Sequence, residues 1–164
     1  MHHAQRTSLP PSRRRPLIAL LASVVAIVAF APSVLADSAQ VTRGDFHAFA
    51  AGIDLPITGR AQMVRTADGR TIVTIHVEGL TAGLTYGSHV HKQSCANGDA
   101  DGHYRFNPAG AATPPNEIWP GPFTANPAGV GNADTIAVGT AGPAAMSVVV
   151  HAPGGAKIAC ADLS

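Results

Sequence analysis

The chain has 164 residues, which is enough for one domain. From residue 37 onward it is rich in Gly, Pro, Ala, Val and Thr and poor in Leu, Glu and Lys, a composition that disfavours helices and suits short strands joined by turns. The formal net charge is +1, from 11 basic and 10 acidic residues, so the chain lacks the strongly basic balance of a nucleic-acid-binding domain.

The first 36 residues are predicted to be a signal peptide. Arg13 to Arg15 form a basic start, Leu17 to Phe30 is an uncharged apolar run, and Val34-Leu35-Ala36 supplies small residues before a cleavage site. The apolar run has 14 residues, fewer than the about 20 that a membrane-spanning helix needs, although an uncleaved anchor is the alternative. We therefore expect a secreted, periplasmic or cell-envelope protein, with one domain over residues 37–164 and no membrane span in the mature chain.

Cleavage after Ala36 would change the charge of the protein. It removes four basic residues and no acidic residue, so the net charge goes from +1 to −3. This negative balance strengthens the exclusion of a nucleic-acid partner, which would need a basic face. The sequence Ser12-Arg13-Arg14 is compatible with the twin-arginine export route as well as with the general secretory route.

Two cysteines, Cys95 and Cys160, remain in the mature chain. An even count in an exported protein predicts one disulfide, because the exported compartment is oxidising. Two buried free thiols are the alternative interpretation.

The predicted strands follow one another with turn signals between them. Residues 59–66 and 71–78 are predicted to form a hairpin around the turn Ala67-Asp68-Gly69. Residues 92–128 hold ten prolines and glycines and form a long irregular connection of the kind that usually carries function. Several short strands of this kind predict an all-β sandwich or flattened barrel with long loops. The remaining strands are expected over residues 84–91, 130–138, 144–151 and 157–163.

Four histidines have the pattern of a metal site. His89-Val90-His91 lies on a predicted strand, where residues i and i+2 point to the same face about 7 Å apart. His103 follows in the adjoining loop, and His151 ends the run Ser147-Val148-Val149-Val150. Four histidines without a thiolate suit copper or zinc, and four nitrogens without an oxygen ligand favour copper.

Together these motifs resemble those of the copper–zinc superoxide dismutase family. Gly87-Ser88-His89-Val90-His91 looks like the family's copper-binding strand, and Gly102-His103-Tyr104 looks like the loop with the histidine that bridges the two metals. Val148-Val149-Val150-His151 resembles the strand with the last copper ligand, and Lys157-Ile158-Ala159-Cys160 is similar to the C-terminal strand. The resemblance runs in order from about residue 58 to residue 163. It implies a Greek-key β-sandwich, a Cys95–Cys160 disulfide, and copper held by His89, His91, His103 and His151.

The sequence departs from the family at the zinc site. The family takes two further histidines and an aspartate from the loop after the bridging histidine, but here no histidine lies between Tyr104 and Val150. The loop between the last copper histidine and the family's arginine is reduced to Ala152–Ala156, and Lys157 stands in the arginine's place. The loss of zinc together with a short loop resembles the copper-only branch of the family, so we expect copper and no zinc.

The resemblance also implies roles for residues around the copper. Glu117 is the candidate partner for the second imidazole nitrogen of His103, the place that zinc occupies in the two-metal enzymes, with a solvated loop carboxylate as the alternative. His103 is expected to carry a proton during turnover. Lys157 is expected to guide the substrate by its positive charge, with a solvated strand-end lysine as the alternative. Trp119 is expected to pack the long loop onto the sandwich. Arg105 and Lys92 are expected to be solvated charges, with a position near the mouth of the copper site as the alternative.

The activity that this resemblance implies is copper-dependent superoxide dismutation, which converts superoxide to O2 and H2O2. One alternative is a non-catalytic copper-binding or copper-buffering domain of the same fold, because the guiding loop and the arginine are both missing. A second alternative is a structural sandwich that holds no metal. Superoxide is the small-molecule partner predicted, and the sequence leaves the oligomeric state open.

Overall fold

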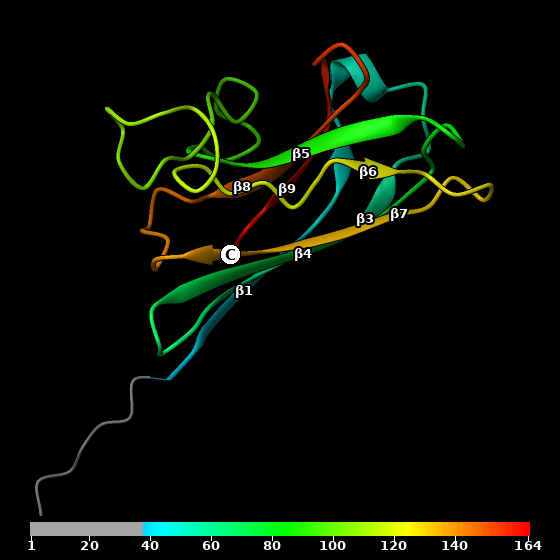
Figure 1. Cartoon of the computed structure of the whole chain (residues 1–164). Helices are drawn as coiled ribbons and strands as arrows, with labels where there is room; N and C mark the ends of the chain where they lie inside the picture. The colour runs from blue at the N-terminus through cyan, green and yellow to red at the C-terminus, as the bar shows by residue number, and fades with distance from the viewer. Residues whose placement is uncertain (1–37) are drawn as a thin grey trace, which may run out of the picture. The chain divides into compact units, whose positions relative to one another are not determined.

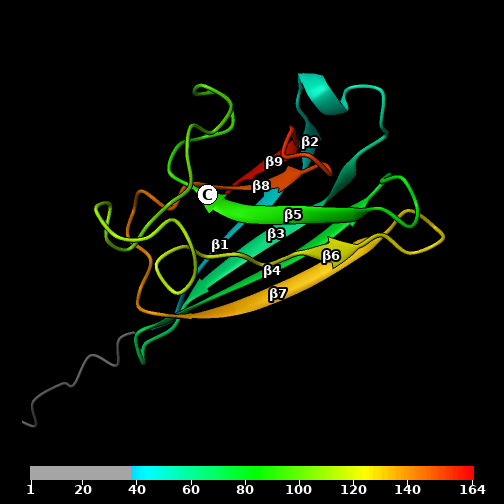
Figure 2. The same ribbon diagram turned by 45° about the horizontal axis from the view of Figure 1, so that its top comes forward.

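The computed structural model describes residues 38–164, and the predicted signal peptide and its cleavage site after Ala36 lie outside them. The described residues form two antiparallel sheets packed on one another, which confirms the predicted all-β sandwich (Figures 1 and 2). No helix in this part of the chain is long and apolar enough to cross a membrane.

The first sheet has four strands in the order β1-β3-β4-β7, and the second has five in the order β2-β9-β8-β5-β6. The 3-10 turn η1 (Ala50–Gly52) follows β2. The strands of the first sheet are β1 (Gln40–Asp45), β3 (Thr58–Arg65), β4 (Arg70–Glu78) and β7 (Gly131–Val138). Those of the second sheet are β2 (His47–Ala48), β5 (Thr85–His91), β6 (Phe123–Thr124), β8 (Ser147–His151) and β9 (Lys157–Asp162).

The first sheet buries one face only, as β4 illustrates. Val73, Ile75 and Val77 are buried, whereas the residues between them point away from the core. This alternation follows from the two-residue period of a strand. The inward side chains of both sheets meet in one large apolar cluster that forms the core of the sandwich.

The strand β8 differs because it is buried along its whole length. Val148 and Val150 lie in the main core, whereas Val149 packs on the opposite face with Cys95 and Cys160. The outer face of the second sheet is therefore covered by the segment that carries Cys95. His151 lies two residues beyond Val149, and the alternation of a strand places it on this covered outer face.

Six predicted strands correspond to β3, β4, β5, β7, β8 and β9, and the hairpin around Asp68-Gly69 is confirmed. The sequence analysis missed β1, because Gln40–Asp45 is mostly polar and contains a glycine. This edge strand is defined by its antiparallel pairing with β3 rather than by its own composition. The short β2 and β6 were missed for the same reason, since each has only two residues and depends on a partner strand.

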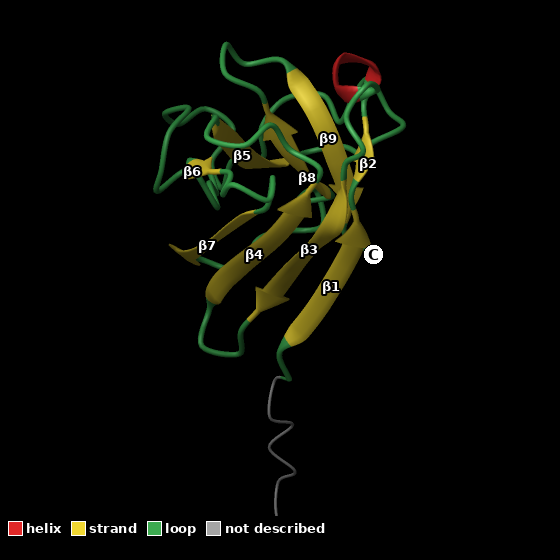
Figure 3. Ribbon diagram, turned by 90° about the vertical axis from the view of Figure 1, so that its right-hand side faces the viewer, coloured by secondary structure: helices red, strands yellow, loops and turns green. Residues whose placement is uncertain are grey.

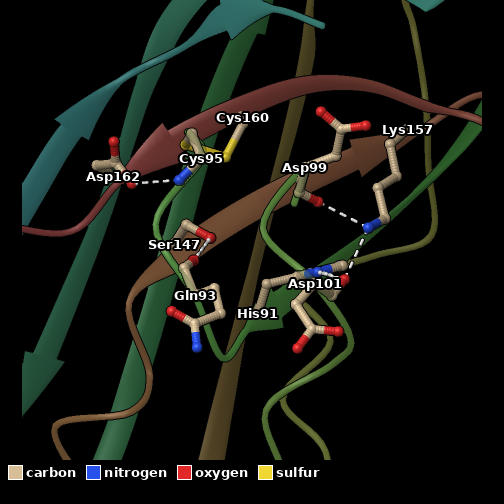
Figure 4. The surroundings of a disulfide bond; sticks show 9 residues. All are labelled: His91, Gln93, Cys95, Asp99, Asp101, Ser147, Lys157, Cys160 and Asp162. Carbon is tan, nitrogen blue, oxygen red and sulfur yellow. Dashed lines mark hydrogen bonds between the residues drawn. A yellow bond between two sulfur atoms is a disulfide. The ribbon is translucent and has the colours of Figure 1, made fainter. Parts of the chain in front are cut away.

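The Cys95–Cys160 disulfide is present, as the sequence predicts, and leaves no free cysteine in residues 38–164. It joins the loop after β5 to the last strand, and two hydrogen bonds reinforce the same junction (Figure 4). The Cys95 backbone N–H donates to Asp162 Oδ1 at 2.7 Å, and Ser147 Oγ donates to the carbonyl of Gln93 at 2.7 Å. The loop that leads from His91 to His103 is therefore fixed onto β8 and β9. A disulfide also fits an extracellular protein.

Candidate metal centre

Four histidines converge on the covered outer face of the second sheet. One ligand atom from each lies within 4.8 Å of the ligand atoms of all the others, which is close enough for them to hold a single metal ion. The group consists of His89, His91, His103 and His151, the four residues that the sequence analysis selected.

Strand pairing explains how residues far apart in sequence meet here. His89 and His91 point to the same side of β5, and β8 runs antiparallel beside it with His151 opposite Gly87. His103 comes from the loop, where it forms an isolated bridge opposite His91. The Tyr104 N–H donates to the Val90 carbonyl at 2.8 Å, which keeps this part of the loop against the end of β5.

Hydrogen bonds made by Nδ1 fix the orientation of three of the four imidazole rings. Their Nδ1 atoms donate to acceptors outside the cluster, so in the neutral ring each Nε2 carries the free lone pair and is available to a metal. His91 Nε2 and His151 Nε2 lie only 3.3 Å apart, where two lone pairs would repel unless a cation lay between them. The three acceptors are the Asp101 carbonyl for His91, the Gly155 carbonyl for His151, both at 3.0 Å, and Glu117 Oε2 for His103 at 2.6 Å.

His89 differs from these three because it presents Nδ1, rather than Nε2, to the cluster. Its Nδ1 is buried and has no hydrogen-bond partner among the described residues. A buried polar atom without a partner is unusual and costs free energy, and a bound metal ion would satisfy it. The donor set that fits a metal is therefore Nδ1 of His89 with Nε2 of the other three histidines.

The cluster favours neutral imidazoles. Burial, together with repulsion from the neighbouring His103 and His151, lowers the pKa of His89 and of His91 to about 3. Burial also lowers the pKa of His151. Because a histidine must be unprotonated to bind a metal, these ligands are ready for a metal at neutral pH without losing a proton.

Glu117 lies directly behind His103, at the place where the sequence analysis predicted a partner. Its carboxylate is only 2% exposed and accepts three hydrogen bonds. Oε2 accepts from His103 Nδ1 at 2.6 Å and from Trp119 Nε1 at 2.8 Å, and Oε1 accepts from Arg105 Nε at 3.0 Å. Burial alone would raise the pKa of Glu117, but the donors, His103 foremost, outweigh it and keep the pKa below its usual value. The carboxylate is therefore charged, and it can fix the His103 ring.

Trp119 and Arg105 have contacts that the sequence analysis missed. Arg105 was interpreted as a solvated charge and Trp119 as a packing residue, whereas both donate to the buried carboxylate of Glu117. Trp119 also lies against His89, with 4.9 Å between the ring centroids. The sequence could have indicated these two hydrogen bonds, because a buried carboxylate needs donors and both residues lie within twelve positions of Glu117.

Lys157 also lies at the site, but its ammonium group is engaged by the backbone. Nζ donates to the carbonyls of Asp99 and Asp101, both at 2.7 Å (Figure 4). The Asp101 carbonyl is the same acceptor that orients His91. Lys157 thus holds the ligand loop against β9, and its predicted part in guiding a substrate stays a prediction.

Two cavities open beside the histidines. One, of about 470 Å³, reaches His89, His103 and His151, and no charged side chain lines it. The other, of about 300 Å³, is lined by His103 together with Lys92 and Arg105. Small molecules can therefore approach the centre through an uncharged opening, while Lys92 and Arg105 line the second cavity.

A scan of the sequence against models of known protein families finds no match, and a search of curated proteins finds none either.

The partner of His103 can be tested with Glu117→Gln. An amide in place of the charged carboxylate should leave His103 loosely held, and metal affinity should fall about 10-fold or more. Competition with a chelator of known affinity measures this. Trp119→Phe removes only one of the two donors to Oε2, so its effect should be smaller. Equal affinity in Glu117→Gln and the unmodified chain would contradict the assigned contact.

The low pKa values of His89 and His91 predict how the metal-free protein responds to acid. In the unfolded chain these histidines take up protons near pH 6.5, whereas in the folded chain they do so only near pH 3. The unfolded state therefore binds more protons between these values, and the free energy of unfolding should fall as the pH is lowered through this window. Urea unfolding of the metal-free protein at several pH values measures this dependence.

A matched pair of variants isolates the cause of that pH dependence. His91→Gln should flatten the acid loss of stability. His76→Gln should not flatten it, because the hydrogen bonds of His76 with Asn132 and Glu78 raise its pKa and give it the opposite sign. An identical slope in His91→Gln and the unmodified chain would contradict the assignment.

Proposed function

We propose that this chain is an exported copper-only superoxide dismutase. The observation that carries the proposal is the cluster of four imidazoles, in which the outer nitrogen of His103 is occupied by a buried carboxylate rather than by a second metal. The resemblance of the sequence motifs to the copper–zinc superoxide dismutase family supports the same conclusion.

The donor set supports copper as the metal. Four imidazole nitrogens with no thiolate and no oxygen ligand suit copper better than calcium, magnesium or manganese. A zinc site of the family type would need more histidines beyond His103, and the four-histidine group is the one metal-binding cluster of His, Cys, Asp and Glu among residues 38–164. Bound copper would supply one-electron redox chemistry, by which two superoxide ions and two protons become O2 and H2O2.

The residues around the centre would admit the substrate, orient His103 and supply positive charge. The opening beside His89, His103 and His151 admits a small anion. Glu117 keeps the proton on His103 Nδ1, so His103 Nε2 is the atom at which a metal or a proton can be held. Lys157 contributes positive charge near His91 and His151 while its hydrogen bonds hold the ligand loop in place.

A non-catalytic copper-binding or copper-buffering domain is the second candidate. The observation that favours it is the absence of charged side chains from the lining of the opening beside His89, since an anionic substrate would gain nothing there from local attraction. A sandwich that holds no metal is disfavoured by the buried, unpartnered Nδ1 of His89.

Metal content and activity separate these functions. After loading with copper and zinc together, elemental analysis should find one copper and no tightly held zinc per chain. The copper-loaded protein should disproportionate superoxide, and His103→Gln should lose most of this activity. Stoichiometric zinc beside copper would refute the copper-only assignment, and copper without activity would favour the buffering function.

Lys157 tests the guidance of the substrate. If its charge attracts superoxide, the rate should fall as ionic strength rises through about 0.1 M, where the Debye length is about 10 Å. Lys157→Ala should be slower with a flatter salt response, and Lys157→Arg should be at least as fast as the unmodified chain. Because Lys157 also holds the loop behind His91, copper affinity of each variant must be measured in parallel. An unchanged rate and salt slope in Lys157→Ala would remove this role.

Export with removal of the first 36 residues is part of the same proposal. The basic, apolar and small-residue order of that segment motivates it, and the disulfide of the domain fits it. Mass spectrometry of the protein recovered outside the cytoplasm should identify Asp37 as the first residue. A full-length chain retained in the cytoplasm would contradict it.

A further inference from the structure

The outer face of the first sheet carries a row of apolar side chains that crosses all four strands. The register places Val41 of β1 opposite Val64 of β3, Val64 opposite Ile72 of β4, and Ile72 opposite Ile136 of β7. Val41 is 46% exposed and Ile136 is 58% exposed. Val138, two residues along β7 on the same face, is 81% exposed. Figure 3 shows the four strands of this sheet side by side.

A polar row lies next to this apolar row and ends in opposite charges. It runs from Arg43 on β1 through Gln62 and Thr74 to Asp134 on β7. Three strand intervals of about 4.8 Å separate its ends by about 14 Å, so Arg43 and Asp134 cannot pair within one molecule. No salt bridge of either residue occurs in the described part of the chain, although every other charge on this face has a partner there.

We propose that this face is the interface between two copies of the chain. The two copies would be related by a twofold axis that lies between the sheets and runs along the strands, midway between β3 and β4. Such an axis places β1 of one copy over β7 of the other. Val41 would then meet Ile136 of the second copy, and Val64 would meet Ile72. Sheets that pack face to face with roughly aligned strands are a common arrangement in proteins.

The same axis pairs the two charges that form no ion pair within residues 38–164, although Arg43 Nε donates a hydrogen bond to Gln62 Oε1 at 2.8 Å. Arg43 of each copy would lie over Asp134 of the other, so two symmetric ion pairs would border the apolar row. Twofold symmetry requires this kind of self-complementarity, in which residue i meets residue j and residue j meets residue i. An unrelated partner would have no reason to match both the apolar row and the separation of these charges.

The remaining charges of the face do not oppose the pairing. The outward-facing strand residues include three arginines and three acids, so the face is balanced. Four strands about 4.8 Å apart and about 20 Å of strand length give a planar footprint of roughly 400 Å², which is small beside the about 800 Å² of accessible surface per partner in typical specific complexes. A contact of this size belongs with weak, transient interfaces rather than obligate ones, so the dimer should be reversible and depend on concentration.

Sedimentation velocity tests this inference on the protein as it is recovered from its cell. The measurement should cover about a hundredfold range of protein concentration, which corresponds to about 2.7 kcal/mol in association free energy. The sedimentation coefficient should rise from that of a monomer to that of a dimer. Ile136→Glu should weaken association about 10-fold or more, because it places a charge in the apolar row. Ile53→Glu is the matched control, since Ile53 is 70% exposed but lies outside this sheet, and it should leave association unchanged.

A charge exchange tests the axis itself. Arg43→Glu and Asp134→Arg should each weaken the dimer about 10-fold or more, because each places like charges opposite one another. Arg43→Glu combined with Asp134→Arg should restore association to near that of the unmodified chain. These readouts need neither copper nor superoxide, so they can fail while the proposed function stands.

Four results would overturn the inference. A monomer at every concentration would show that the face is free. A dimer that resists Ile136→Glu would use another surface. Dimerisation weakened by both single charge changes but not restored by their combination would exclude the proposed axis, as would a higher-order assembly in place of a dimer.

Discussion

The attachment of one loop to the outer face of the second sheet is the constraint on which the four-histidine cluster depends. The segment between His91 and His103 has little regular structure of its own, yet it must place one ligand and orient another. The Cys95–Cys160 disulfide, the hydrogen bond to Asp162 and the two hydrogen bonds from Lys157 all tie it to β9. Without this attachment, the Asp101 carbonyl would not be held behind His91.

The second constraint is a buried carboxylate whose charge is fully compensated. Glu117 brings a negative charge into a region with little solvent, which is costly unless donors surround it. His103, Trp119 and Arg105 supply those donors, so the same three hydrogen bonds keep Glu117 charged and His103 oriented. In the function proposed here, this network takes the structural place of a second metal, and a rigid ring is obtained without zinc.

The two outer faces of the sandwich differ in chemistry because they are covered differently. A loop covers the outer face of the second sheet, which shields the histidines and lowers the pKa values of His89 and His91. Within residues 38–164, no such loop covers the row of Val41, Val64 and Ile136, and the side chains of Val41 and Ile136 remain about half exposed. A metal centre on one sheet and a proposed contact between copies on the other can therefore operate without interference.

The sequence by itself determined most of the strands, the disulfide and the four histidines of the cluster. These features follow from local patterns: alternation defines β4, an even cysteine count predicts the bond, and the spacing of His89 and His91 places both on one side of a strand. Only the tertiary structure decided which nitrogen each ring presents, because hydrogen bonds from distant carbonyls set that choice. The same holds for the edge strand β1 and for the contacts of Arg105, Trp119 and Lys157. Their roles depend on partners brought close by folding, and spacing along the chain contains no information about such partners.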